Sequence, residues 1–490
     1  MGTVAKQYEP VVSAPMLPVS SETVGELIRH IEAKYDLLQY ELDGWCIWPV
    51  LRFSAAMALM DLPFTKSKES FQLRELCGIA AKDLPRLFFP RRSRYAVVTL
   101  SSALMEQEGD RYRDVFFDDL LRNLGSFFKI EKLNNKSFLP RSKAALFKSD
   151  VTSTAFEILS SLVLPKFGRS PEISSVAEQL SASLSREPGL QSFSPQRVAA
   201  ILENFYWNKR LYFWLLGRVK PEFLFSADGY GDHAVIAAAK ERGIKVCEFQ
   251  HGGFMKGGPE YGWSSYALSY KAKMPVPDQL FLFGEYWKEQ LEDGGFWNGR
   301  LLAVGNMRID RYRKLKKHYR SSRTDDACNI VLTTQGIDTH KLITFISDFL
   351  RVAEGKLEIS LSIKLHPVYE ADKGIYEREF LKNAKPVRVI SGNEAPSTFE
   401  LLAAADLHLS ISSSCHYDAL GLGVPTVILP LANSGWILSL HRAGYAFLAS
   451  TPEALLEIVL QLNRGETADA VGSYYFRPGA LENIKGALGV

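Results

Sequence analysis

Two successive series of short apolar segments that alternate with helical segments restrict the fold of this chain more than any other feature. The first series begins at residues 95–100 and ends at 301–304, and the second runs from 329–333 to a helix at 452–463. The apolar segments are short and rich in β-branched and aromatic residues, like strands buried in a parallel sheet. Strands that alternate with helices form such sheets. The sequence therefore predicts an α/β protein with two Rossmann-like domains that face each other across a cleft.

The composition of the remaining segments predicts the domain boundaries. Residues 1–93 read as a mobile tail rich in proline and serine, followed by a helical extension whose apolar residues recur at helical spacing. A basic, polar stretch has the composition of a linker, and the last segment is expected to pack back on the N-terminal domain. The resulting assignment is an N-terminal Rossmann-like domain at 94–310, the linker at 311–327, a C-terminal Rossmann-like domain at 328–470 and the returning segment at 471–490.

The charge and the cysteines of the sequence exclude several functional classes. The 490 residues carry a formal net charge of only +3, without the concentrated basic surface of a nucleic-acid-binding protein. Five scattered cysteines, an odd number without metal-ligand spacing, indicate a reduced protein and not a disulfide framework. The N-terminus lacks the features of a signal peptide, and no apolar run is long enough to span a bilayer. We therefore expect a cytoplasmic protein that binds no nucleic acid and is not integral to a membrane.

Polar residues follow the predicted strand at 223–226, and ligands of doubly wound sheets bind beyond the carboxyl ends of the strands. Asp228, Gly229 and Asp232 lie in this loop. Either aspartate is a candidate base or nucleophile at the edge of the sheet. For Asp232 there is an equally good alternative, since an aspartate directly before a helix often caps it.

A histidine between a strand and two glycines marks the next candidate loop. The segment Gln250-His251-Gly252-Gly253 ends the predicted strand at 245–250. The glycines allow the backbone to approach a ligand closely, and a histidine there can bind phosphate or transfer a proton. We therefore predict that His251 belongs to the site.

The strand at 359–365 of the second series ends in a His-Pro motif. Lys364 closes the strand, and Pro367 restricts the backbone so that the imidazole of His366 points in a fixed direction. The alternative is a proline that merely terminates the strand beside an incidental histidine.

Two further loops of the second series carry polar groups beside a helix start. Ser412, Ser413 and Ser414 precede a helix, where hydroxyl and amide groups bind phosphate; the alternative is that a serine only caps the helix. Gln335 and Gly336 follow the strand at 329–333 and are a weaker signal.

Other histidines and lysines favour structural roles. His340 and His408 lie on or beside regular elements and are expected to be structural. The lysines of the predicted linker, Lys314, Lys316 and Lys317, are expected to form a solvated face.

The motif KLHP at 364–367, the serine run and the segment ALGLGVPTVILP at 419–430 resemble the C-terminal half of GT-B glycosyltransferases. More narrowly, a His-Pro motif followed by a Ser/Thr pair is similar to bacterial sialyltransferases, to Kdo transferases of capsule and O-antigen synthesis, and to teichoic-acid glycerophosphotransferases. FGEYWKEQL at 283–291 and VGNMRID at 304–310 resemble interdomain segments of this group. The resemblance covers residues 220–460.

The resemblance implies a glycosyltransferase that moves a sugar from a nucleotide-activated donor to a growing capsule or lipopolysaccharide O-antigen glycan, an oligosaccharide or lipid-linked acceptor. In that group the His-Pro histidine and the serines hold the donor phosphate, and an acidic residue of the N-terminal domain acts on the acceptor or the sugar. Carried over, Asp228 would be the base of an inverting reaction or the nucleophile of a retaining one, and His251 would assist the acceptor or bind phosphate. The remaining carried-over positions are a donor set, His366, Pro367, Ser412, Ser413, Ser414, Gln335, Gly336 and Lys364, and an acceptor-side loop, Gly229, Gln250, Gly252 and Gly253.

The sequence departs from this group at two positions, and these departures narrow the choice of donor class. Ala227 stands before Asp228 where sialyltransferases have an acidic pair, and Gln250 stands where glycerophosphotransferases usually have an aromatic residue. A CMP-sugar such as CMP-Kdo is therefore the expected donor. No DxD triplet occurs, so neither a metal nor a cofactor is expected. The alternatives are a CDP-glycerol glycerophosphotransferase, a UDP-sugar epimerase and a non-catalytic polysaccharide-assembly protein.

A lipid-linked acceptor would require a peripheral contact with the inner face of the cytoplasmic membrane. The candidate is the segment RLFFPRRSR at 86–94, in which four arginines flank Leu87, Phe88 and Phe89. The alternative is that Phe88 and Phe89 pack into the core while the arginines are solvated.

Overall fold

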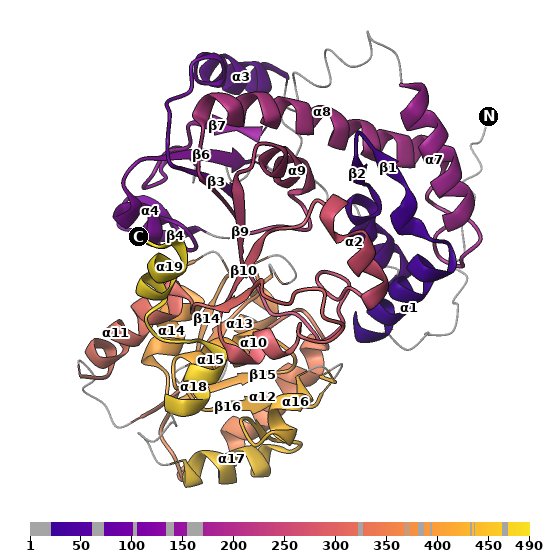
Figure 1. Cartoon of the computed structure of the whole chain (residues 1–490). Coiled ribbons are helices and arrows are strands. Elements are labelled where there is room, and N and C mark those ends of the chain that lie inside the picture. Colours follow the sequence, from indigo (N-terminus) through magenta and orange to yellow (C-terminus); the bar gives the residue numbers. More distant parts are fainter. Residues whose placement is uncertain are drawn as a thin grey trace, which may run out of the picture.

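Two parallel β-sheets, one in each half of the chain, organise the computed structural model (Figure 1). The structure describes residues 21–60, 73–100, 105–133, 142–153, 170–321, 327–367, 370, 372–380, 387–392, 394–431, 434–435, 437–462 and 469–490. The predicted tail at 1–20 lies outside these residues. Helices surround both sheets, which confirms the α/β fold with two Rossmann-like domains. None of the described helices is long and apolar enough to cross a membrane.

The N-terminal sheet has its topological switch point between β3 and β8. Its seven parallel strands lie in the order β11 (Leu301–Ala303), β10 (Gln279–Leu282), β9 (Lys245–Phe249), β8 (Phe223–Ser226), β3 (Tyr95–Leu100), β6 (Phe127–Lys132) and β7 (Val151–Thr152). From β3 the chain adds strands in one direction, and from β8 it adds them in the other. Ligands of such sheets bind at this reversal, beyond the carboxyl ends of the strands.

The C-terminal sheet has the same kind of switch point between β12 and β15. Its six parallel strands lie in the order β14 (Val387–Ile390), β13 (Ile359–Lys364), β12 (Cys328–Thr333), β15 (Leu407–Ser410), β16 (Thr426–Ile428) and β17 (Phe447–Leu448). The loop that carries Gln335 follows β12, and the serine run follows β15. Both candidate loops therefore flank the reversal.

Burial on both faces explains why the strands are apolar throughout. In β3, Ala96 and Val98 pack under the helices α8 (Pro195–Val219) and α9 (His233–Glu241). Tyr95 and Val97 point to the opposite face and join the larger core. The side chains from Tyr95 to Thr99 are therefore all buried, as expected for a parallel sheet covered by helices.

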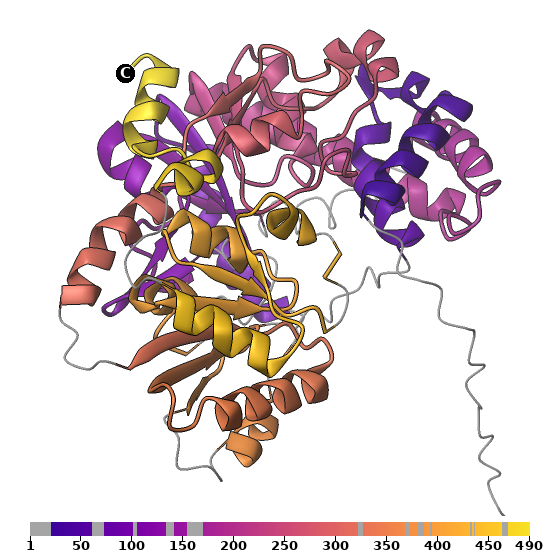
Figure 2. The same ribbon diagram turned by 90° about the horizontal axis from the view of Figure 1, so that it is seen from below.

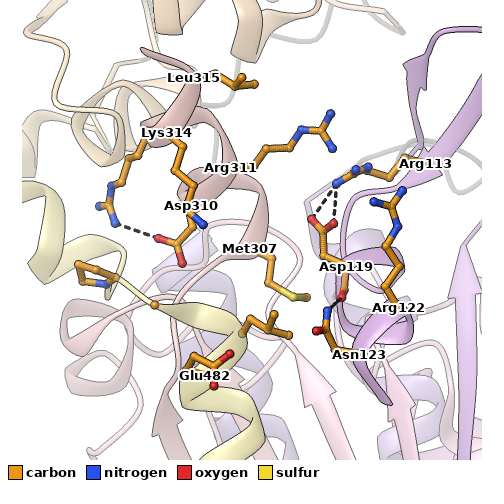
Figure 3. A pocket seen from close by; sticks show the side chains of 14 residues that line it. Arg113, Asp119, Arg122, Asn123, Met307, Asp310, Arg311, Lys314, Leu315 and Glu482 are labelled. Atoms are coloured by element: carbon orange, nitrogen blue, oxygen red, sulfur yellow. Dashed lines mark hydrogen bonds and ion pairs between the residues drawn. The ribbon is translucent and has the colours of Figure 1, made fainter. Parts of the chain in front are cut away.

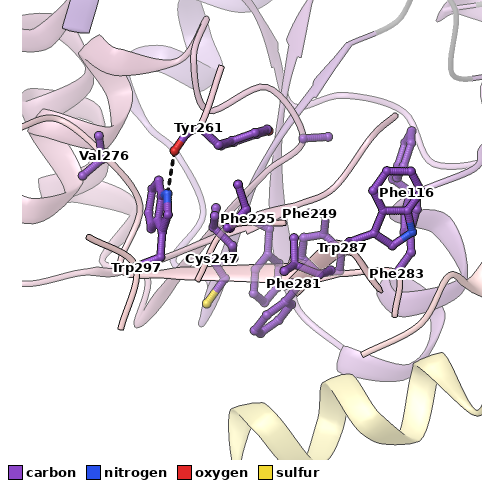
Figure 4. Close-up of a cluster of buried hydrophobic side chains, with 14 of the residues drawn as sticks. Phe116, Phe225, Cys247, Phe249, Tyr261, Val276, Phe281, Phe283, Trp287 and Trp297 are labelled. Carbon is purple, nitrogen blue, oxygen red and sulfur yellow. Dashed lines mark hydrogen bonds between the residues drawn. The ribbon is translucent and has the colours of Figure 1, made fainter. Parts of the chain in front are cut away.

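Aromatic side chains continue the core from the N-terminal sheet into the boundary between the domains. Figure 4 shows them in one continuous group that includes Phe249, Phe281, Phe283 and Trp287. At the boundary the ring of Phe283 stacks on that of Phe476, with 5.2 Å between the centroids. One hydrophobic cluster therefore extends across the boundary, while the C-terminal sheet also has a separate cluster of its own.

The chain passes between the domains a second time near its C-terminus. After α18 (Asp469–Tyr475), the amide of Arg477 donates to the carbonyl of Phe283 at 2.7 Å. The next helix, α19 (Ala480–Leu488), begins with the amide of Ala480 donating to Asp310 at 2.7 Å. Residues 477–490 thus lie on the N-terminal half of the molecule.

The predicted helical extension divides into two separate parts. The helices α1 (Ser21–Lys34) and α2 (Trp48–Leu59) pack beside α7 (Pro171–Leu184) and α8 (Figures 1 and 2). In contrast, α3 (Leu73–Phe88) packs at the other end of the N-terminal domain, against β7.

Two polar segments form regular elements. One is a β-hairpin of β4 (Met105–Glu108) and β5 (Arg111–Asp114), turned at Gly109 with a φ of 65° and followed by the helix α4 (Asp118–Leu124). The predicted linker at 311–327 was wrong up to Ser321, because these residues belong to α11 (Met307–Ser321). Lys316 of this helix, which was expected in a solvated face, donates to the carbonyls of Leu422 and Gly423 in the C-terminal domain at 2.7 and 2.6 Å.

Candidate functional site between the two domains

A pocket of about 200 Å³ lies between the two domains. His251, Gly252 and Gly253 enter it from the loop after β9, and Ser414 and Asp418 enter it from the other domain. Asn306 and Arg308, at the start of α11, complete its polar lining. Aromatic side chains form the walls: Phe116, Phe283, Trp287, Phe399, Tyr417 and Phe476.

His251 is held in the pocket by Tyr230. The tyrosine hydroxyl and Nε2 of the imidazole are 2.8 Å apart, whereas Nδ1 is buried without a hydrogen-bond partner in the described part of the chain. Burial lowers the pKa of His251, against the opposing effect of Asp228, so the imidazole is neutral at neutral pH. An unpaired buried nitrogen is costly, which makes this ring a candidate for contact with a ligand.

The two aspartates after β8 occupy different environments. Asp232 is buried, and its carboxylate accepts hydrogen bonds from Lys132, at 2.6 Å, and from the hydroxyl of Ser226. It stands at the N-cap position of α9 but makes no capping hydrogen bond with its side chain. Asp228 lies 3.3 Å from the ammonium of Lys132 and keeps 17% of its side chain exposed. Asp228 is therefore the aspartate that a substrate can reach.

A third carboxylate lies buried beneath this loop. Glu248, on β9, accepts a hydrogen bond from Tyr261 at 2.5 Å, and burial raises its pKa to about 8. A side chain at Gly229 would place a Cβ only 1.9 Å from Oε2 of Glu248, so the loop requires glycine there. Gly229 therefore packs on Glu248. This contact explains why the position requires glycine, and no ligand is needed to explain it.

Gln250 fixes the loop that carries His251. Its amide nitrogen donates to the carbonyl of Gly252 at 2.9 Å, and its amide oxygen accepts from the backbone of Phe283 at 2.8 Å. Because the side chain is buried in these contacts, Gln250 positions the loop and is not itself aimed at the pocket.

The helices α1 and α2 hold the other end of the same loop. Arg52 is buried beside Glu32, 2.5 Å from its carboxylate, and donates to the carbonyls of Pro259 and Gly262. Phe53 packs on Tyr230, with 4.6 Å between the ring centroids. The helical extension therefore supports the Tyr230–His251 pair from behind.

Arg308 and Asp418 bring charge into the pocket. The guanidinium of Arg308 donates to Glu106 of β4 at 2.7 Å through Nε and stacks 3.6 Å over the ring of Phe399. Burial raises the pKa of Asp418 to about 6, against the opposing charge of Arg308. The pocket therefore contains a cation, with a partly buried acid that ionises near neutral pH.

The three serines have three different roles. The backbone and hydroxyl of Ser412 donate to the amide oxygen of Gln335 at 3.2 and 3.0 Å, which locks the loops after β12 and β15 together. The hydroxyl of Ser413 accepts from the amide of Cys415 at 3.2 Å. Ser414 is exposed, makes no capping hydrogen bond in α15 (Cys415–Gly421) and lines the pocket. Of the three, Ser414 is the one that faces the pocket.

The His-Pro loop lies at the same edge of the sheet but does not line this pocket. His366 is partly exposed after β13, one strand beyond β12, and Pro367 lies directly against Gly392. Lys364 must be removed from the candidate donor contacts. Its ammonium donates to the carbonyls of Ser391, Glu394 and Pro396 at 2.9, 2.6 and 3.0 Å, so all three of its hydrogens are used.

Gly336 and His408 also have structural partners. The amide of Gly336 donates to the carboxylate of Glu370 at 3.1 Å. His408 is buried between Thr333 and Thr426, 2.9 and 2.8 Å from their hydroxyls, in agreement with its expected structural role.

Sequence reasoning found the loops of the pocket but missed part of its lining. Arg308 lies within VGNMRID, whose interdomain position was the available signal. Neither Asp418, inside a short helix, nor Lys132, at the end of a strand, carries a local signal. Within the described residues, no group of three or more His, Cys, Asp or Glu side chains could hold a metal ion.

Comparisons with known proteins identify the fold. No protein-family model matches the sequence, and no curated protein matches it. Among solved structures, UDP-GlcNAc 2-epimerase from Neisseria meningitidis bound to UDP-GlcNAc is 15% identical, with a TM-score of 0.51 over 80% of this chain and 99% of that one. MurG from Acinetobacter baumannii is 12% identical, with a TM-score of 0.42 over 81% and 99% of the two chains. The wall teichoic acid polymerase TagF is 11% identical, with a TM-score of 0.42 over 86% and 98%. The likeness to the epimerase shows a shared GT-B fold.

Proposed function

We propose that this protein is a glycosyltransferase that moves a sugar from a nucleotide-activated donor to a bacterial surface glycan. The observation that carries the proposal is the pocket between the domains, where His251 and Arg308 meet Ser414 and Asp418. Ser414 follows β15, beside the switch point of the C-terminal sheet, and His251 follows β9, the neighbour of the switch-point strand β8. Ligands of doubly wound folds bind beyond the carboxyl ends of such strands.

The proposed site residues divide into acceptor and donor sides; Asp228 and His366 are included although they do not line the pocket itself. On the acceptor side, Asp228 would take the proton of the attacking hydroxyl, and His251 would orient that hydroxyl. On the donor side, Ser414, Arg308 and His366 would stabilise the negative charge of the departing phosphate without a metal ion. Nη1 of Arg308 makes no hydrogen bond with a described residue, so it is available for such a phosphate.

The proposed donor is a CMP-sugar such as CMP-Kdo, and the proposed product is a capsule or lipopolysaccharide O-antigen glycan. The His-Pro motif and the serine run at one sheet edge support this donor class. A thermal-shift series with CMP, CDP, UDP, GDP and UDP-GlcNAc tests it, because a ligand that binds only the folded state raises the melting temperature. CMP and CDP should stabilise the protein most, and H366A and S414A should lose that stabilisation. A clear preference for UDP would reject the cytidine donor.

A UDP-sugar epimerase is the second candidate, favoured by the shared fold with the N. meningitidis enzyme. The two functions differ in their need for an acceptor. Turnover of UDP-GlcNAc in the absence of any acceptor would establish the epimerase and contradict the transferase.

The proposed site of action is the inner face of the cytoplasmic membrane. The alternative in which both aromatics of the 86–94 segment enter the core is wrong, since Phe88 is 52% and Phe89 85% exposed. Arg91 and Arg94 form surface ion pairs with Asp150 and Glu222. Exposed aromatics beside arginines suit an anionic membrane surface.

A further inference from the structure

A second and larger pocket, of about 770 Å³, lies between α4, α11 and α19 (Figure 3). It uses a different face of α11 from the site between the domains. Met307, Arg311 and Lys314, spaced along one side of the helix, line it, whereas Arg308 and Tyr312 point to Glu106. The pocket is therefore separate from the proposed catalytic site, and its volume is that of a small-molecule site.

Positive charge exceeds negative charge around this pocket. Five cationic side chains and three carboxylates line it, an excess of two positive charges. The cations are Arg113, Arg122, Arg311, Arg313 and Lys314, and the carboxylates are Asp119, Asp310 and Glu482.

Three of these cations lack a strong partner. Arg122 and Lys314 form no hydrogen bond or ion pair with another residue in the described ranges, and both are exposed. Arg311 has a single ion pair of 3.5 Å, to Glu108. That carboxylate already accepts a hydrogen bond from Arg113 at 2.7 Å. Glu108 is thus shared between Arg113 and Arg311, and the pKa of its carboxyl is lowered first by Arg113 and further by Arg311 and Arg122.

Apolar side chains lie beside the cations. Met307, Leu315 and Leu481 line the same pocket, and Figure 3 shows Arg311 extending from α11 toward α4, which carries Arg122. A ligand that satisfies both parts needs an anionic group of more than one charge and an organic body. A phosphate ester has this composition, and guanidinium groups match the geometry of its oxygens.

We propose that the pocket between α4, α11 and α19 binds a phosphate ester, with the phosphate between Arg122 and Arg311 and the organic group over Met307 and Leu481. The proposal does not depend on the transferase function, because none of these residues belongs to the site between the domains.

Isothermal titration calorimetry of the full-length protein with phenyl phosphate tests the proposal. Wild type should bind it, and R122A and R311A should each weaken binding about tenfold or more, as expected for lost charge-assisted hydrogen bonds. K341A, an exposed lysine on α12 (Thr339–Val352), should bind like wild type. Unchanged melting temperatures of R122A and R311A would show that the loss of affinity does not come from unfolding.

Each other result would overturn a defined part of the proposal. Wild-type affinity in both arginine variants would reject the location. Equal affinity for phenyl β-glucoside or benzoate would reject the phosphate. Equal affinity for inorganic phosphate would reject the role of Met307 and Leu481.

Discussion

The carboxylate of Asp232 lies 2.6 Å from the ammonium of Lys132, in a buried ion pair that reaches across the switch point of the N-terminal sheet. Burial acts to lower the pKa of Lys132, but Asp232 and Asp228 raise it overall, so the lysine remains charged. Lys132 is the last residue of β6 and the two aspartates follow β8, so the pair joins the carboxyl ends of two strands that are separated by β3. Lys132 therefore forms ion pairs with both the buried Asp232 and the partly exposed Asp228.

Exchange of each aspartate for asparagine should separate these roles. Asp232→Asn should reduce the free energy of unfolding by roughly 3 kcal/mol, because it breaks a buried ion pair. Asp228→Asn should leave stability nearly unchanged but slow sugar transfer about a hundredfold or more, as expected for loss of a general base. Urea denaturation and initial rates measure the two effects. Wild-type rates in Asp228→Asn would show that another group takes the proton.

Arg52→Met should loosen the helical extension and the loop behind His251. The substitution removes the cation beside the buried Glu32 and leaves it the hydrogen bond from the indole of Trp48, which costs about 3 kcal/mol of stability. Hydrogen exchange of residues 252–262 should become faster, because Arg52 binds two carbonyls of that loop. Lys34→Met is the matched control, since Lys34 pairs with Glu187 but is 47% exposed. Equal exchange in the two variants would contradict the supporting role of Arg52.

Glu248 should make the stability of the protein fall as the pH rises from about 5 to 8. Burial raises its pKa from 4.5 to about 8 in the folded state. Both states hold the proton below the unfolded value, whereas between the two values the unfolded chain ionises and gains relative stability. In Glu248→Gln this contribution is absent, so the free energy of unfolding of wild type should decline relative to the variant over this range. Parallel pH profiles would show that Glu248 ionises normally in the folded protein.

Exchange of the exposed aromatics should test membrane contact. The double variant Phe88→Ser, Phe89→Ser should sediment less with vesicles of phosphatidylglycerol and phosphatidylcholine, and Arg92→Gln should reduce binding roughly fivefold. Activity on a soluble acceptor should be unchanged. Leu460→Ser is the control, because Leu460 is 55% exposed but lies on α17 (Pro452–Gln461), at the opposite end of the molecule (Figure 1). Wild type that stays in the supernatant at low salt would contradict the membrane proposal.

Local sequence patterns predict the strands and most helices. A strand that is buried on both faces of its sheet is a largely continuous apolar run in the sequence, which makes it recognisable. The strand at 223–226, for example, has the bounds that the sequence predicts. The hairpin of β4 and β5 was missed because its residues are polar and its stabilising contacts are made with residues far away in the sequence. Glu106, for example, accepts a hydrogen bond from Arg308. The basic part of α11 was missed for the same reason, since Lys316 binds carbonyls more than a hundred residues away.

The candidate site was predictable only in loops whose composition, with glycines or serines directly after a strand, indicates a binding loop. His251 and Ser414 follow strands beside glycines or serines, and the structure brings both to one pocket. By contrast, the role of Lys364 depends on the fold of the loop at 391–396, which a histidine-proline motif does not reveal. Asp418 reaches the pocket only through the pairing of two domains, so no short segment identifies it.

The two passages of the chain between the domains limit how the domains can move. One passage is at Asn306, before α11, and the other is near Arg477, which binds Phe283. A body joined to another at two separate points retains essentially one rotation, about the line through both points. Atoms beside that axis are displaced least, and Arg308 and Phe476 lie next to it. A change in interdomain angle would therefore preserve the inner wall of the pocket while its outer rim widens or narrows, which would admit substrate without disturbing the residues beside the axis.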